Sequence, residues 1–127
     1  MLHILLSIFA YDIWFYISHL LLHTKSLYRF HKAHHKKIYP TFIDTYVGHP
    51  FETLFQGVGT FVPYAFYTYS TTDTIIILCF LNIRGMMRHD KRGTWLVGNH
   101  HLLHHQYAQY NYGEVWLDYL GGTLIRK

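Results

Sequence analysis

The chain has 127 residues, of which 50% are apolar, 19% aromatic and only 14% charged, with a formal net charge of +4. A soluble globular domain carries about 25% charged residues, so the composition favours a single domain that resides in a membrane. The lone cysteine, Cys79, excludes a disulfide framework and a paired-cysteine metal site.

Residues 2–23 are almost continuously apolar, which is about the 20 residues that a membrane helix requires. The polar residues in this segment, Asp12, Tyr16, His19 and His23, are spaced four, three and four apart and form one helical stripe. Ionisable groups are costly in hydrocarbon and are usually functional there, so the stripe should face protein. The segment is too long and too apolar for a signal peptide, and we expect it to stay in the mature protein.

Residues 24–48 are amphipathic and basic, and they predict a short interfacial helix followed by a loop. Cations directly follow the apolar segment, and no nucleic-acid-binding module is recognisable. We therefore expect lipid headgroups rather than nucleic acid as their partner. The cations are Lys25, Arg29, Lys32, Lys36 and Lys37.

Residues 51–69 and 72–87 are two further apolar stretches, and we expect two helices that turn back on each other. Gly57, Gly59 and Pro63 interrupt the first stretch, and Arg84 shortens the second. A re-entrant hairpin and two straight spans are both compatible with this pattern.

The rest of the chain should carry a histidine-bearing helix over residues 94–109 and then turns around a short helix in residues 111–123. Basic residues follow both the first apolar segment and the hairpin. By the positive-inside tendency, every histidine cluster then lies on the cytosolic side.

Ten of the twelve histidines fall into patterns that suit metal binding. Residues three and four apart share a helix face, so each cluster should aim its imidazoles at one spot. A tetrahedral ion takes about four ligands, so the clusters offer enough nitrogen for two ions, and iron, zinc, copper and nickel all suit imidazole. The ten are His19, His23, His31, His34, His35, His89, His100, His101, His104 and His105.

The isolated histidines and the acidic residues leave several roles open. His3 favours a structural role, and His49 and His89 could be either structural or ligands. His100 lies one step off the face of its neighbours and could be an outer partner. Asp12 could accept the free ring N–H of a metal-bound histidine, or bond to Tyr16 instead.

Several enzyme classes are excluded. A zinc protease needs His-Glu-x-x-His, but Leu20 and Leu102 follow His19 and His101. There is no Gly-x-Ser-x-Gly elbow and no phosphate loop. The few acidic residues do not supply the Glu-x-x-His pairs of a carboxylate-bridged di-iron bundle.

The combined motifs resemble the fatty acid hydroxylase, or sterol desaturase, superfamily of membrane histidine-motif di-iron oxygenases. The resemblance covers roughly residues 10–123, with order, spacing and flanking residues in agreement. The motifs are Asp12-x-x-x-Tyr16-x-x-His19-x-x-x-His23, Leu27-Tyr28-Arg29-Phe30-His31-Lys32-Ala33-His34-His35, Gly48-His49-Pro50-Phe51-Glu52, His101-x-x-His104-His105, Asn111-Tyr112-Gly113, Asp118 and Gly121-Gly122-Thr123.

This resemblance implies an all-α integral membrane helical bundle with a cytosolic histidine-rich di-metal cap, a single domain over residues 1–127 that is minimal and short at its N-terminus. It implies an O2-dependent lipid hydroxylase or desaturase with two iron ions, for which zinc could substitute. Asp12, Tyr16 and His100 are candidate outer partners. The implied ligands are His19, His23, His31, His34, His35, His89, His101, His104 and His105.

The implied partners are a lipid substrate, the membrane, and a small cytochrome or reductase that docks on Lys32, Lys36 and Lys37. The short hairpin makes a homodimer a candidate assembly, and a eukaryotic protein of this kind belongs in the endoplasmic reticulum. One alternative is a non-catalytic metal-binding membrane protein that keeps the histidine cage. A metal-ion transporter would need ionisable residues along several spans, whereas here they gather at one face.

Overall fold

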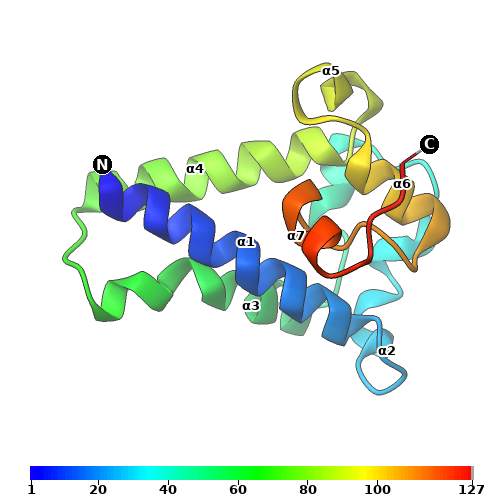
Figure 1. The fold of residues 1–127 in the computed structure, drawn as a ribbon, viewed down its shortest axis with the longest axis horizontal. Helices are drawn as coiled ribbons and strands as arrows, with labels where there is room; N and C mark the ends of the chain where they lie inside the picture. The colour runs from blue at the N-terminus through cyan, green and yellow to red at the C-terminus, as the bar shows by residue number, and fades with distance from the viewer. Residues whose placement is uncertain (127) are drawn as a thin grey trace.

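In a computed structural model that describes residues 1–126, helices are the only regular secondary structure of the described chain. Helices α1, α3 and α4 run lengthwise, and α2, α6 and α7 gather at one end (Figure 1). Four of the elements are 3-10 helices, labelled η. In chain order the elements are α1 (Leu2–Leu22), α2 (Tyr28–His31), η1 (His34–Lys36), η2 (Phe42–Tyr46), α3 (Pro50–Gly57), η3 (Val58–Ala65), α4 (Thr71–Arg88), η4 (Lys91–Gly93), α5 (Thr94–Val97), α6 (His100–Tyr107) and α7 (Val115–Leu120).

The two long helices agree with the apolar segments that predicted them. Helix α1 covers the first segment, and α4 starts at a capping box in which Ser70 and Asp73 satisfy each other's backbone N–H. The first arm of the hairpin is not a straight helix, because it changes from α3 to the 3-10 helix η3 at Gly57 and contains Pro63.

The expected single helix over residues 94–109 is wrong. The structure has two short helices, α5 and α6, separated at Gly98. Gly98 has a φ of 74°, a conformation that ends a helix and that glycine adopts without steric cost. Helix α6 ends at Ala108 in the left-handed region, with a φ of 54°.

Polar side chains point inward in this fold and many apolar side chains point outward. On α1 the buried residues include Ser7, Asp12 and His19, whereas Leu2 is 69% exposed and Phe9 52%. Within the described chain, α1 is the helix long and apolar enough to cross a membrane. An apolar exterior of this extent is unusual for a soluble monomer and suits contact with lipid.

Hydrogen bonds and the ion pair of Arg84 with Asp12 connect the three lengthwise helices. The indole Nε1 of Trp14 donates to the Phe55 carbonyl at 2.6 Å, which joins α1 to α3. Arg84 on α4 donates to the Asp12 carboxylate on α1, with Nη1 3.1 Å from Oδ2. These contacts fix how α1 and α4 approach the histidine end of the molecule.

The closest approach between α1 and η3 occurs at Gly59, where an added Cβ would overlap the Cβ of Trp14 and lie 2.9 Å from its Cγ. Gly59→Ala should therefore lower the free energy of unfolding by about 1–3 kcal/mol through overpacking. Gly57→Ala is the matched control, because nothing lies within 4 Å of its added Cβ. Equal unfolding midpoints of the two variants in detergent would contradict this packing.

Candidate metal centre

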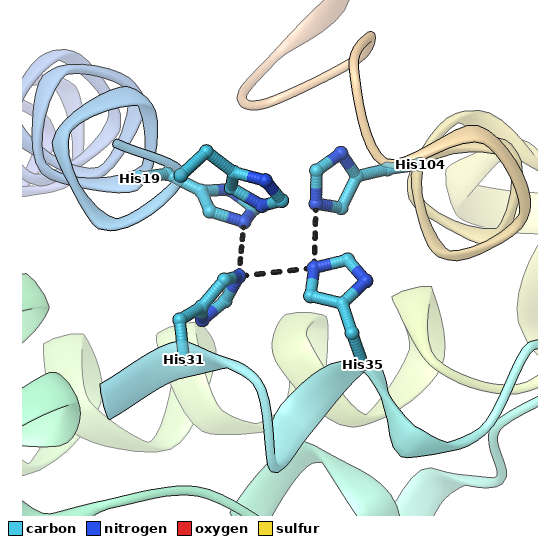
Figure 2. A group of neighbouring side chains, drawn as sticks. His19, His31, His35 and His104 are labelled. Atoms are coloured by element: carbon cyan, nitrogen blue, oxygen red, sulfur yellow. Dashed lines mark hydrogen bonds between the residues drawn. The ribbon is translucent and has the colours of Figure 1, made fainter. Parts of the chain in front are cut away.

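Nine histidines converge at the end of the bundle in two groups. In each group one ligand atom per residue lies within 4.8 Å of the others. The first, which we call the five-histidine group, is shown in part in Figure 2. Its members are His19, His23, His31, His35 and His104, and the four-histidine group consists of His34, His89, His101 and His105.

The division between the groups follows helical spacing. Three pairs four residues apart stay together, namely His19 with His23, His31 with His35, and His101 with His105. Residues four apart are rotated by only about 40° around a helix, whereas residues three apart diverge by about 60° in the other sense. The expectation that each cluster points at one spot is confirmed for His19 and His23. It is wrong for the other two clusters, since His34 and His104 leave their local partners and join the other group.

In the five-histidine group, tight hydrogen bonds to backbone carbonyls hold the Nδ1 atoms of His19 and His104. His19 Nδ1 lies 2.6 Å from the Tyr112 carbonyl oxygen. His104 Nδ1 lies 2.6 Å from the Tyr110 carbonyl oxygen. A carbonyl only accepts, so each Nδ1 carries the proton and each Nε2 presents a lone pair to the group.

The four-histidine group is held in the same way by other segments. His34 Nδ1 donates to the Val47 carbonyl at 3.0 Å, and His105 Nδ1 to the Lys37 carbonyl at 3.2 Å. His89 Nδ1 donates to the Gly85 carbonyl one helical turn earlier at 2.8 Å.

The nitrogens that face inward are very close to one another. His34 Nε2 lies 2.9 Å from His89 Nε2, and His89 Nε2 lies 3.0 Å from His101 Nε2. In His34 and His89 both Nδ1 atoms are donors, so the facing Nε2 atoms of the neutral rings have lone pairs and cannot bond to each other. Such an approach is favourable only around a shared cation.

The same contacts continue through the five-histidine group in Figure 2. Nε2 atoms are 3.0 Å apart between His19 and His31, between His31 and His35, and between His35 and His104. Metal–nitrogen bonds of about 2.1 Å place neighbouring ligand nitrogens roughly 3 Å apart. Buried Nε2 atoms of His23 and His105 also have no hydrogen-bond partner within the described chain. The donor set therefore fits two histidine-bound metal ions.

Burial keeps these imidazoles uncharged, because a cation is poorly solvated there. It lowers the pKa of His23 to about 4, of His35 and His89 to about 3, and of His105 to about 2. Neighbouring imidazoles oppose charge further, so at pH 7 each ring can offer a lone pair to a metal.

Glu52 also belongs to the site, although the sequence analysis assigned it no role. Its Oε1 lies 2.7 Å from His31 Nδ1, and the side chain is buried. Burial raises the pKa of its carboxyl to about 8. Its only signal in the sequence was its place two residues after Pro50 in a motif that also contains His49.

The three candidate outer partners have the following contacts. Asp12 pairs with Arg84, and the Tyr16 hydroxyl lies 3.0 Å from Thr123 Oγ1. His100 Nε2 lies 2.9 Å from Asp118 Oδ2.

His3 and His49, like His100, are outside both groups. His49 is exposed, and its Nδ1 accepts the Phe51 N–H at 3.1 Å, so it caps the start of α3. His3 lies near the N-terminus of the chain, where its Nε2 is 3.3 Å from Asp73.

A cavity of about 320 Å³ lies between α1, α3 and α4 and reaches histidines of both groups. Its wall includes the apolar or aromatic side chains of Tyr11, Phe15, Leu78 and Leu81. A small apolar segment of a ligand could therefore approach both groups at once.

The sequence profile of the fatty acid hydroxylase family matches residues 4–123. The chain is 32% identical over 130 residues to the Delta(7)-sterol 5(6)-desaturase ERG3 of Saccharomyces cerevisiae, an alignment that covers 94% of the chain and 35% of that relative. It is 31% identical over 121 residues to the Delta(7)-sterol 5(6)-desaturase of Leptosphaeria maculans, covering 88% and 34%. It is also 44% identical over 52 residues to methylsterol monooxygenase 1 of Rattus norvegicus, covering 40% and 18%.

The chain thus spans about a third of the length of the desaturases it matches, at 35% and 34%. No solved structure matches it significantly.

The lowered histidine pKa values predict how acid affects the metal-free protein. Histidines of the unfolded chain gain protons below about pH 6.5, whereas the buried ones gain them only near their lowered pKa values. Stability should therefore be fully present above pH 6.5 and fall towards pH 3, by about 1.4 kcal/mol per pH unit for each such histidine. Denaturant unfolding midpoints of metal-free protein between pH 7.5 and 4.5 test this. A flat profile would show that the rings are not buried as neutral groups.

Proposed function

The chain belongs to the fatty acid hydroxylase family, and we propose that it forms the oxidising centre of a membrane-bound di-iron enzyme. In this proposal the enzyme uses O2 to hydroxylate or desaturate a lipid, such as a fatty acyl chain or a sterol. The observation that carries the proposal is the pair of histidine groups beside one partly apolar cavity. The relatives' names, sterol desaturase and methylsterol monooxygenase, support oxidation of a lipid.

The nine histidines of the two groups are the proposed metal ligands. Their donor set is entirely nitrogen, which suits iron but also zinc, so zinc could occupy the same positions. When bound, a pair of irons supplies the redox chemistry that activates O2 and removes hydrogen from a C–H bond. Glu52 keeps the His31 ring oriented, because its Oε1 lies 2.7 Å from Nδ1.

In this proposal the protein positions the substrate in the cavity. The cavity wall contributed by Phe15, Leu78 and Leu81 would hold an apolar chain beside His19, His34 and His89. Holding a reacting carbon in place removes much of the entropic cost of its reaction.

We place α1 across the membrane and the histidine groups on its cytosolic side. The outward apolar side chains of α1 and α4 support contact with lipid. The basic residues that follow both helices favour the cytosolic side, and in a eukaryote the membrane would be that of the endoplasmic reticulum.

The electron donor in this proposal is a small cytochrome or reductase with an acidic surface. Lys32, Lys36 and Lys37 are exposed on the same short segment that carries His31, His34 and His35. A donor bound there would lie close to the metal ligands, and charge complementarity would speed its association.

The homodimer that the short hairpin makes a candidate assembly stays a prediction.

Iron content and spectroscopy test the metal assignment. Protein expressed with iron-57 and purified in detergent should hold about two magnetically coupled irons per chain by Mössbauer spectroscopy. His34→Ala and His104→Ala should each lose iron and lower lipid turnover by more than about 100-fold, because even outer partners of ligands cost about 10–100-fold. His3→Ala should change neither. One zinc or no metal after iron loading would favour a non-catalytic metal-binding protein.

The cavity assignment predicts a separate effect. Leu81 is 8% exposed and lines the cavity, so Leu81→Phe should narrow it and lower turnover by roughly 10–100-fold at unchanged iron content. Ile76 is 48% exposed on the same helix and does not line the cavity, so Ile76→Phe is the control. Equal turnover of both variants would place the substrate elsewhere.

A further inference from the structure

Different parts of the chain hold the two histidine groups. The carbonyls that accept from the five-histidine group belong to Tyr110 and Tyr112, in the segment between α6 and α7. Those that accept from the four-histidine group belong to Lys37 and Val47, at the two ends of the loop around η2, and to Gly85. A buried aspartate holds each of these two loops: Asp118 on α7 contacts the first, and Asp44 on η2 lies within the second.

Asp118 organises the segment beside the five-histidine group. The residue is fully buried on α7. Its carboxylate accepts the backbone N–H of Tyr112 at 2.8 Å, the N–H of Gly113 at 2.9 Å and the hydroxyl of Thr123 at 2.6 Å. His100 Nε2 lies 2.9 Å from the same carboxylate. These contacts hold the peptide whose carbonyl binds His19.

Asn111 strengthens the same segment. It has a φ of 61°, and its side chain bonds to the His100 carbonyl at 3.2 Å and to the Ile125 carbonyl at 3.1 Å. The chain therefore turns sharply between Tyr110 and Tyr112, so that two carbonyls two residues apart both reach the five-histidine group.

Asp44 organises the loop beside the four-histidine group. Its carboxylate accepts the Thr41 N–H at 2.7 Å and hydroxyl at 2.8 Å, and it pairs with Lys37 Nζ at 2.8 Å. The backbone N–H of Val47 donates to the Asp44 carbonyl at 3.0 Å. Thr45 in the same loop lies 2.9 Å from His89 Nδ1. One loop thus contacts three of the four histidines.

We propose that Asp118 and Asp44 are positioning residues, each serving one of the two metals. Asp118 orients ligands of the five-histidine group through residues 110–113, and Asp44 orients ligands of the four-histidine group through residues 37–47. The inference rests on the proposed function, because it assumes one metal ion in each group. Its consequence is that either metal can be lost while the other is retained.

The test compares Asp118→Asn with Asp44→Asn after anaerobic loading with ferrous iron. Asparagine keeps the shape but replaces an accepting oxygen with an N–H donor, so at least one loop contact is lost. Metal analysis of each variant should give about one iron per chain in place of about two. The Mössbauer spectra of the two retained irons should differ, because the ligand sets differ.

Double variants identify which metal is lost. Adding His104→Ala to Asp118→Asn should remove no further iron, whereas adding His105→Ala should remove the remaining iron. For Asp44→Asn, adding His105→Ala should remove no further iron, whereas adding His104→Ala should remove the remaining iron. Asp73→Asn is the control, because Asp73 caps the far end of α4 and should leave both irons in place.

A smaller substitution separates the loss of iron from misfolding. Thr123→Val removes one 2.6 Å hydrogen bond to Asp118 and should weaken the binding of one iron by about 10-fold or more, with circular dichroism unchanged. The assignment is overturned if both aspartate variants keep two irons, or if Thr123→Val weakens both irons equally. A wild-type chain that holds fewer than two irons would instead contradict the proposed function.

Discussion

The hydrogen bonds from imidazole Nδ1 to backbone carbonyls are the constraint on which the rest of the structure depends. They fix the tautomer of the ring, so that Nε2 lone pairs of His34 and His89 face each other at 2.9 Å. In a buried site this arrangement is unfavourable without a cation between the nitrogens. The fold therefore prepares ligands for a metal, and loops that supply carbonyls are as much part of the centre as the histidines.

The distribution of polar and apolar residues follows from this centre. Buried residues of the described chain include many histidines and carboxylates and few large apolar side chains, whereas Leu2, Leu5 and Phe9 of α1 are exposed. Ion pairs such as Arg84 with Asp12 keep the polar interior neutral where the cavity passes between the helices. In the proposed function, this cavity is where an apolar chain would lie beside the histidines.

Some features of the fold and site could be predicted from local pattern. Apolar length predicted α1, and the spacing of His19 and His23 predicted that these two rings share a group. The break at Gly98 was missed, because a glycine inside a polar, histidine-bearing stretch does not reveal its φ. The positions of His34 and His104 were also missed, since each leaves its neighbours for a group formed by other helices.

The sequence by itself determined the kinds of ligand, their spacing within each helix and the apolar surface. Those properties depend on residues only a few positions apart. Only the tertiary structure decided how nine rings divide into two groups, and which carbonyls orient five of them. Tyr112 and His19 are 93 residues apart in the chain, and their contact depends on how whole segments pack. Asp118 and Asp44 acquire their proposed positioning roles only in the tertiary structure, because each holds a loop against histidine rings from other segments of the chain.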